Sequence, residues 1–260
     1  MTTYTIGDIH GQLGMLEDTL ALIEKDGGSA ARIVFLGDYV DRGANSKGVI
    51  DLFLRGQAEG RDWIFIKGNH DRMFQRFVET GKSDDERILS GKRWLHERLG
   101  GVDTLNSYLD TTELLQSLNA PSDQMIDYGI DPIPQPQLGQ VLEALRAAIP
   151  ETHLRFLEGL QLNHIEDGKF FVHAGVRPGV PLSLQQEDDM LWVRDEFLPD
   201  TRDHGALIVH GHSPVETDYP DLRPNRLNMD TGAGYGRPLS AAVFEGDQVL
   251  HLTAKGRVPL

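Results

Sequence analysis

Three motifs near the start of the sequence place polar side chains directly after an apolar, β-branched run. They read GDIHG at 7–11, GDYVDRG at 37–43 and GNHD at 68–71. Two further motifs, HAG at 173–175 and HGHSP at 210–214, add histidines behind similar runs. Carboxylates, imidazoles and an amide that recur at strand ends are typical of residues that bind metal ions or carry out acid–base chemistry.

Six of these side chains are candidate metal ligands: Asp8, His10, Asp38, Asn69, His173 and His212. The chain contains no cysteine, which excludes thiolate ligands and thiolate nucleophiles. Carboxylate and imidazole together suit Mn, Fe or Zn. Two such ions about 3.5–4 Å apart can share a bridging carboxylate and a bridging water, and six protein ligands suit such a pair.

Each motif also has a structural explanation when it is taken alone. A Gly-Asp pair after a strand is common, and a lone His173 or His212 is more often a hydrogen-bonded core histidine than a ligand. Asn69 belongs to a residue type that is favoured as a helix N-cap. Because all six side chains fall at one edge of the predicted sheet, we expect a metal centre.

The elements that must position these residues alternate over the first 70 positions. Short apolar strands are expected at 3–8, 32–38 and 62–69, with amphipathic helices at 13–25 and 46–57. This alternation predicts βαβ units in a sheet that is covered on both faces. Ligands bind at the carboxyl ends of the strands in such sheets. The Gly-Asp and Gly-Asn pairs lie at those ends, where glycine allows a sharp turn.

Residues 71–165 have a different pattern and predict a mostly helical insertion over one edge of the sheet. Helical spacing is found at 72–81, 85–101, 103–109 and 138–148, and a proline-rich loop is expected at 120–137. Strand patterns return at 169–175, 205–212, 226–232, 239–246 and 248–254, the last two as a hairpin. The expected fold is α/β (α+β) with a second, partly antiparallel sheet, in one domain that spans 1–260.

The composition sets limits on partners and location. The 260 residues are 39% hydrophobic and carry a formal net charge of −15, which argues against non-specific binding of nucleic acid. No apolar run reaches the roughly 18 residues of a membrane span. The first residues, MTTYTIGD, show no export signal. We therefore expect a cytoplasmic protein, in agreement with the absence of cysteine.

The five motifs, in this order, resemble the PPP family of metal-dependent phosphoprotein phosphatases, and in particular its smaller, bacterial-type members. The resemblance runs from residue 7 to residue 213. It implies a calcineurin-like metallophosphoesterase fold, a β-sandwich of two mixed sheets flanked by helices. It also implies two divalent metal ions per chain, for which we expect manganese ahead of iron or zinc.

The resemblance also implies a role for each motif residue. Asp8 and His10 would bind the first ion, Asp38 would bridge both, and Asn69, His173 and His212 would bind the second. A metal-bridging hydroxide would be the nucleophile. His70 would be the general acid, held by Asp41, and Arg42 would hold phosphate oxygens.

Simple chemistry supports these roles. Two cations lower the pKa of a shared water, so that hydroxide forms near neutral pH. A leaving alkoxide needs a proton, and an imidazolium that is oriented by a carboxylate is suited to give it. The planar fork of an arginine matches phosphate oxygens.

Five further residues have roles that the motifs leave open. Arg194, in LWVRDEF, either helps to bind phosphate or forms an ion pair on a helix surface. Tyr235 lies either at the rim of the site or in ordinary packing. Arg72 and Arg177 directly follow motif segments and could also face the site. For His210, two positions before His212, we expect a structural or supporting role.

The substrate is less closely defined. Many eukaryotic-type members have glutamate where this chain has Asp71, and aspartate is found there in symmetrical dinucleoside tetraphosphate hydrolases. Those hydrolases usually lack the aspartate that corresponds to Asp41, so we expect a phosphomonoesterase that acts on phosphoserine or phosphothreonine in proteins. The alternative is a symmetrical dinucleoside tetraphosphate hydrolase or a phosphatase of small metabolites. A non-enzymatic, metal-dependent scaffold is disfavoured by the intact pair of His70 and Asp41.

Overall fold

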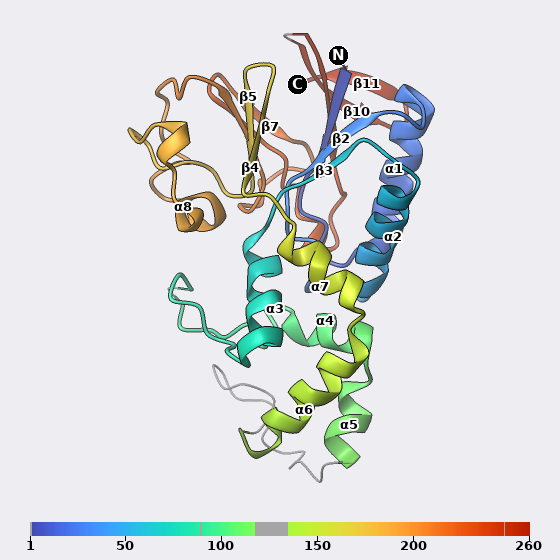
Figure 1. Cartoon of the computed structure of the whole chain (residues 1–260). Helices are drawn as coiled ribbons and strands as arrows, with labels where there is room; N and C mark the ends of the chain where they lie inside the picture. The colour runs from blue at the N-terminus through green and yellow to red at the C-terminus, as the bar shows by residue number, and fades with distance from the viewer. Residues whose placement is uncertain (1, 89, 118–134, 247) are drawn as a thin grey trace.

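The computed structural model describes residues 2–88, 90–117, 135–246 and 248–260. In this part of the chain, two β-sheets stand next to each other, with α1 and α2 outside one sheet and α8 beside the other (Figure 1). A group of helices that follows β3 in the chain extends below the sheets (Figure 1). Most of the proline-rich loop predicted at 120–137 lies outside the described residues.

The first sheet has the strand order β11-β10-β9-β1-β2-β3. Its strands are β1 (Thr2–Ile6), β2 (Arg32–Phe35), β3 (Trp63–Phe65), β9 (Ala241–Glu245), β10 (Gln248–Thr253) and β11 (Gly256–Pro259). β1, β2 and β3 run parallel, as the βαβ pattern predicts. β9 pairs antiparallel with β1 and with β10, which confirms the predicted hairpin.

The second sheet has the order β4-β5-β6-β8-β7. Its strands are β4 (Asn163–Glu166), β5 (Lys169–Val172), β6 (Leu207–His210), β7 (Asp221–Arg223) and β8 (Arg226–Asn228). β5, β6 and β8 are parallel, and β4 and β7 are antiparallel edge strands. Two mixed sheets flanked by helices confirm the predicted fold. The sequence did not indicate β4, β7 and β11, which are short and only partly buried.

The helices are α1 (Leu13–Gly27), α2 (Ser46–Ala58), α3 (Asn69–Thr80), α4 (Gly101–Tyr108), α5 (Thr111–Ser117), α6 (Gln135–Ala148), α7 (Glu151–Glu158) and α8 (Glu187–Trp192). Short 3₁₀ turns occur at Leu182–Leu184 and Ala233–Tyr235. The helices predicted at 13–25 and 46–57 correspond to α1 and α2.

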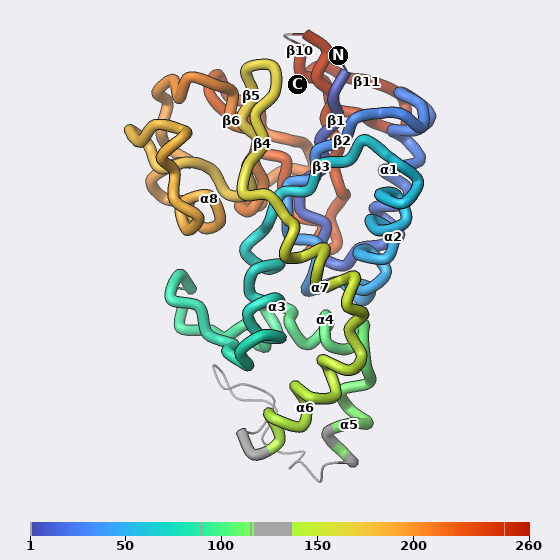
Figure 2. Tube along the Cα trace, viewed as in Figure 1, coloured from blue at the N-terminus to red at the C-terminus, as the bar shows by residue number. Residues whose placement is uncertain are grey.

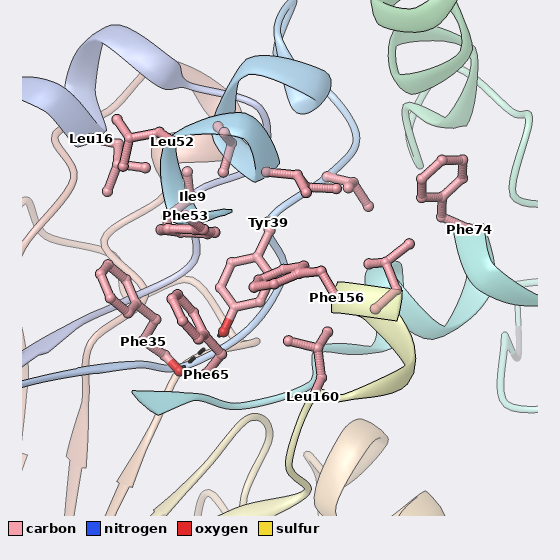
Figure 3. Packing of buried hydrophobic residues seen from close by; sticks show 14 of the residues in the cluster. Ile9, Leu16, Phe35, Tyr39, Leu52, Phe53, Phe65, Phe74, Phe156 and Leu160 are labelled. Carbon is pink, nitrogen blue, oxygen red and sulfur yellow. Dashed lines mark hydrogen bonds between the residues drawn. The ribbon is translucent and has the colours of Figure 1, made fainter. Parts of the chain in front are cut away.

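The core has two apolar layers, one between the first sheet and its helices and one between the two sheets. Phe53, Phe65 and Phe156 contact the ring of Tyr39, and Phe35 stacks on Phe65 (Figure 3). The hydroxyl of Tyr39 donates to the carbonyl oxygen of Ile66 at 2.6 Å and lies 3.2 Å from that of Phe35. The apolar layer between the two sheets is formed by Val34, Leu36, Ile66, Phe171, Val209, Leu227, Met229, Ala242 and Phe244. The two layers hold the strand ends that carry the motifs in fixed positions.

The prediction of a helix at 85–101 is wrong. Apart from residue 89, which is not described, this stretch consists of turns and ends where α4 begins. Gly91 and Gly100 adopt φ values of 68° and 80°, which a right-handed helix does not allow. Trp94 and Leu95 are buried here, and the ring of Trp94 packs on Phe74 and Phe77 of α3 without the segment forming a helix.

Helices α3 to α7 lie between β3 and β4 in the chain and appear as the teal-to-yellow part of Figure 2. α4 packs against α2, and α7 packs against both α2 and α3. We propose that residues 71–165 are an insertion within one domain, because these contacts join the helices to the same core as the first sheet. Among the described residues, no helix is both long and apolar enough to cross a lipid bilayer.

The cluster around Tyr39 should contribute strongly to stability. Phe53 is fully buried and contacts five other aromatic rings, those of Phe35, Tyr39, Trp63, Phe65 and Phe156. We predict that Phe53→Ala lowers the free energy of unfolding by about 3–5 kcal/mol, measured by urea denaturation. Leu184→Ala is the control, since Leu184 is 61% exposed and its change should stay within about 0.5 kcal/mol. Equal effects of the two substitutions would contradict this account of the core.

Candidate metal centre and active site

The predicted site residues follow strand ends in both sheets. Asp8 and Asp38 come shortly after β1 and β2, and Asn69 opens α3 just beyond β3. His173 and His212 come directly after β5 and shortly after β6. Strands that run parallel bring their carboxyl ends to one edge of the sheet. The topology therefore gathers residues that are far apart in the sequence.

The loops of the two sheets contact each other at this edge. The backbone N–H of His212 donates to Asp8 Oδ2 at 3.0 Å, and His173 Nδ1 donates to the carbonyl oxygen of Leu36 at 2.8 Å. The N–H of Gly211 donates to the carbonyl oxygen of His173 at 2.7 Å. All six predicted ligands are buried. The structure thus brings the six side chains together from both sheets.

The backbone of these loops is strained. Non-glycine residues with left-handed φ values occur at His10 (49°), Asp38 (52°), Asp41 (75°), Arg42 (65°) and His212 (67°). In the described part of the chain, only Asp167 joins them. Such conformations cost about 1–3 kcal/mol each and concentrate at active sites, where the surrounding structure enforces them. The strain therefore marks the same loops as the motifs.

Two glycines let the backbone approach the carboxylates. A Cβ atom at Gly68 would collide with the side chain of Asp38, and one at Gly211 would collide with the carboxylate of Asp8. The glycines of the motifs are thus required by the close approach of the main chain to two of the proposed ligands.

Asp38 lies between two groups of candidate ligands. Its Oδ2 is 3.5 Å from His10 Nε2, and its Oδ1 is 3.4 Å from His173 Nε2. It belongs both to a group with His10 and His70 and to a group with His173 and His212, each with ligand atoms within 4.8 Å of one another. A carboxylate with one oxygen toward each group is suited to bridge two cations.

The histidines are prepared for metal binding. His10 Nδ1 donates to the carbonyl oxygen of Val40 at 2.9 Å, and His173 Nδ1 donates to that of Leu36. These bonds place the proton on Nδ1 and leave the lone pair of Nε2 facing the site, as in most metal-binding histidines. Burial lowers the pKa of His173 to about 4, so the ring is neutral. The donors present therefore fit a metal ion.

Buried negative charge also requires cations here. Burial and the neighbouring Asp230 and Asp38 raise the pKa of Asp8 well above its usual range. Burial raises the pKa of Asp38 to about 7 and that of Asp230 to about 6. Sequence reasoning missed Asp230, although the DTG that follows a strand pattern was a signal of the same kind as the other motifs. Bound cations would relieve the repulsion among these carboxylates.

His70, Asp41 and Arg42 form a connected unit next to Asp38. His70 Nδ1 donates to Asp41 Oδ2 at 2.5 Å, and Arg42 Nη2 lies 3.2 Å from His70 Nε2. Arg42 Nη1 donates to His10 Nε2 at 2.7 Å. Burial raises the pKa of Asp41 and lowers that of His70. The structure places the predicted acid, its carboxylate partner and the predicted phosphate ligand together.

Arg194 and Tyr235 both lie beside the proposed ligands and line the same cleft. Arg194 Nε donates to His212 Nε2 at 2.8 Å, and its Nη2 donates to the backbone oxygen of His212 at 2.9 Å. Tyr235 is 60% exposed, and the Cζ of Arg42 lies 4.6 Å from the centre of its ring. Among the described residues, the hydrogen bonds of Arg194 go to His212 rather than to a carboxylate, and Tyr235 lies exposed beside Arg42.

Arg72 does not serve the site. It donates to Asp188 at 2.6 Å and to Asp85 at 3.2 Å, so its guanidinium links α8 to the turns after α3. Arg177 lines the cleft described below, but its Nε and Nη2 donate to Asp189 at 2.9 and 2.6 Å. Two carboxylate-bound arginines therefore support the walls of the cleft.

The structure also places His210, Asn69 and Asp71, whose positions the sequence left open. His210 is buried and donates to the oxygen of Gly211 at 3.0 Å, outside both ligand groups. Asn69 is not the N-cap of α3, because that position is Gly68, and Asn69 Oδ1 lies 2.8 Å from His173 Nε2. Asp71 accepts the N–H groups of Asp38, Tyr39 and Gly68, each at 2.9 Å. Asp71 thus holds the loop that carries Asp38.

A cleft of about 550 Å³ lies beside Arg42, Asn69 and His70, which form part of its lining. Its walls carry the cations Arg42, Arg87, Lys92, Arg98, Arg177 and Arg194 and the acids Asp195 and Glu196. Six cations against two acids is a local reversal of charge in a chain whose net charge is −15. Such a cleft attracts anions.

Comparison with known proteins agrees with this geometry. A family model described as calcineurin-like phosphoesterase matches residues 1–243. The catalytic subunit of serine/threonine-protein phosphatase 4 from Candida glabrata is 49% identical over 67 residues, which are 25% of this chain but only 21% of that relative. The asymmetrical bis(5'-nucleosyl)-tetraphosphatase PrpE from Oceanobacillus iheyensis is 26% identical over 259 residues, covering 96% of this chain and 91% of that protein.

The fold is shared with a solved structure as well. A cold-active protein tyrosine phosphatase aligns with 100% of this chain and 78% of its own length, with a TM-score of 0.61 and 14% sequence identity. At this level of identity the likeness concerns the fold alone.

The position of Asp38 between the two ligand groups leads to a prediction. Asp38→Asn removes a negative charge that both groups share. The variant should therefore bind at least one metal ion fewer per chain than the wild-type protein, and it should lose activity. Metal content after dialysis against a defined Mn²⁺ concentration gives the measurement. Asp18→Asn, an exposed change on α1, should bind metal as the unchanged protein does. Full metal content in the Asp38 variant would reject the bridging position.

Proposed function

We infer that this chain, which belongs to the calcineurin-like phosphoesterase family, hydrolyses phosphomonoesters with two bound metal ions. Family membership confirms the resemblance drawn from the five motifs and identifies the chain as a metal-dependent hydrolase. The observation that carries the more specific proposal is the unit of His70, Asp41 and Arg42 beside Asp38, the carboxylate that both ligand groups share.

The six predicted ligands would hold the metal ions. We assign one ion to Asp8, His10 and Asp38, and the other to Asp38, Asn69, His173 and His212. We propose manganese, because imidazole and carboxylate ligands suit it better than they suit magnesium. Bound divalent ions of this kind supply an activated water and neutralise charge on phosphoryl oxygens.

The side chains of this protein then bind and orient the substrate. Each ligand group has an arginine beside it. Arg42 donates to His10 in one group, and Arg194 donates to His212 in the other. Arg42 Nε is buried and has no hydrogen-bond partner among the described residues. We propose that both guanidinium groups turn their N–H donors to phosphate oxygens when substrate enters, since the arginine fork matches such oxygens. Tyr235, stacked on Arg42, would hold that fork in place.

His70 would protonate the leaving oxygen. Its Nδ1 is anchored on Asp41, so its Nε2 faces the point that Arg42 also reaches. The doubly protonated ring would keep its Nδ1 proton on Asp41 and pass its Nε2 proton to the departing oxygen as the ester bond breaks, which leaves the neutral imidazole. A general acid of this kind accelerates such steps by about 10²–10⁴.

The first candidate substrate is a phosphoserine or phosphothreonine side chain of a cytoplasmic protein. The pair of His70 and Asp41 supports it, because the alkoxide of serine or threonine is a poor leaving group that needs a proton. The local similarity to the catalytic subunit of a serine/threonine phosphatase also supports this candidate.

A dinucleoside polyphosphate is the second candidate. The cationic walls of the cleft favour it, since Arg87, Lys92 and Arg98 lie on the turns before α4, beyond the residues that contact the ligand groups. A substrate with several phosphates would use such cations, whereas a single phosphoryl group would not reach all of them. The tetraphosphatase relative aligned along most of its length supports this candidate.

A substrate panel separates the two candidates. A phosphoserine peptide, diadenosine tetraphosphate and p-nitrophenyl phosphate are assayed with Mn²⁺ for the unchanged protein and for the Arg87→Gln/Arg98→Gln variant. If polyphosphates are the substrate, the double variant should lose about 10-fold or more in kcat/KM on diadenosine tetraphosphate alone, as expected when charged hydrogen bonds are removed. Arg223→Gln/Lys255→Gln, with the same change of charge at exposed positions elsewhere, is the control. Faster turnover of the peptide, with no effect of the double variant, would support the protein substrate.

The general acid is tested by the dependence on leaving group. His70→Asn should keep its metal ions yet lower kcat on the phosphoserine peptide by about 10²–10⁴. The loss on p-nitrophenyl phosphate should be much smaller, because p-nitrophenolate leaves without a proton. Equal losses on both substrates, or loss of metal from the variant, would show that His70 is not the acid.

A further inference from the structure

The carboxylate of Asp41 is held by two residues of the predicted insertion. Trp94 Nε1 donates to Asp41 Oδ2 at 2.7 Å, and Thr104 Oγ1 donates to Asp41 Oδ1 at 2.6 Å. The backbone N–H of Asp41 donates back to Thr104 Oγ1 at 2.8 Å. Asp41, Trp94 and Thr104 are all completely buried. Both oxygens of the carboxylate that contacts His70 are therefore fixed by donors from the predicted insertion.

The same segment supports the strained backbone of the loop. Asp41 and Arg42 are consecutive non-glycine residues with φ values of 75° and 65°. The N–H of Arg42 donates to the carbonyl oxygen of Gly100 at 3.2 Å. A Cβ atom at Gly100 would collide with the backbone of Arg42. Strained conformations persist only where neighbouring structure enforces them, and here residues 94–104 supply that structure.

The supporting residues are themselves held firmly. The ring of Trp94 packs on Phe74 and Phe77 of α3, with ring centres 5.8 and 4.8 Å away. Its backbone N–H donates to the oxygen of Ser83 at 2.6 Å. Thr104 lies on α4, and its hydroxyl is also 3.1 Å from that of Ser46 at the start of α2. The segment therefore connects the loop of Asp41 to α2, α3 and α4.

We propose that Trp94 and Thr104 are positioning residues for the acid step, which they control by fixing the carboxylate that orients His70. This inference rests on the proposed function of His70 as general acid. The two donors stabilise the charged form of Asp41 and prevent its rotation, so the imidazole is held with Nε2 toward the leaving oxygen. The insertion then takes a direct part in the acid step, through contacts that no motif of the sequence contains.

The test measures how strongly the rate depends on the leaving group. Phenyl phosphate and p-nitrophenyl phosphate have the same phosphoryl group but leaving oxygens of different basicity. Thr104→Val keeps the shape of the side chain and removes its donor and acceptor. We expect Thr104→Val to lower kcat on phenyl phosphate by about 10-fold, the effect of one charge-assisted hydrogen bond, with little loss on p-nitrophenyl phosphate and no change in KM. Trp94→Phe should likewise lower kcat on phenyl phosphate more than kcat on p-nitrophenyl phosphate.

Conservative and distant variants separate positioning from folding. Thr104→Ser retains the hydroxyl and should restore most of the rate on phenyl phosphate. Thr19→Val removes a buried hydroxyl, bonded to the oxygen of Met15, far from the site and should leave both rates unchanged. In a His70→Asn background, Thr104→Val should cause no further loss, because residues that act through one another are not additive.

Each outcome has a distinct meaning. Two results would overturn the positioning role. One is an equal loss of kcat on both esters in Thr104→Val. The other is that Thr104→Val lowers kcat as much in the His70→Asn background as it does in the wild-type protein. A normal effect of His70→Asn combined with no effect of Thr104→Val and Trp94→Phe would overturn this inference alone. Failure of His70→Asn to change the leaving-group dependence would instead overturn the proposed function.

Discussion

Asp8, Asp38, Asp71 and Asp230 are buried at one edge of the two sheets. Burial raises the pKa of each, and repulsion from a neighbouring aspartate raises it further for Asp8, Asp71 and Asp230. Carboxylates are rarely buried without a partner, because the loss of hydration is costly. Backbone N–H groups partly satisfy Asp71, and that of His70 donates to Asp38 Oδ1. The two oxygens of Asp38 nevertheless lie only 3.5 and 3.4 Å from Nε2 of His10 and of His173. Divalent cations between these groups would offset the repulsion, so the proposed ligands and their supporting loops are arranged around this cluster of carboxylates.

The loops are built to create this concentration of charge. Parallel strands bring the ligands to one edge, glycines allow the main chain to reach the carboxylates, and left-handed φ values turn side chains inward. The strain this introduces must be offset by surrounding contacts. Asp71 holds the loop of Asp38, and Trp94 and Thr104 hold the loop of Asp41. Ligand binding and the acid step are thus supported by separate sets of hydrogen bonds.

The sequence indicated where the proposed ligands lie because they depend on local patterns: an apolar strand, a glycine and a polar residue recur within a few positions. The supporting residues could not be predicted in this way. Trp94 and Thr104 meet Asp41 across more than 50 positions. Thr104 lies on α4, close to the helix predicted at 103–109, but the segment of Trp94 was expected to be a helix because its apolar spacing fits one. Tertiary packing on α3 determined its conformation instead. Arg72 was a site candidate by its place after a motif, but nearby acids of α8 bind its guanidinium.

The central claim is that Asp38 is shared by two metal ions. Anomalous diffraction from crystals grown with Mn²⁺, recorded near the manganese absorption edge, tests it most directly. The account predicts two anomalous peaks, one beside His10 and the other beside His173, with the carboxylate of Asp38 between them. A single peak, or a pair of peaks that does not contact Asp38, would contradict it.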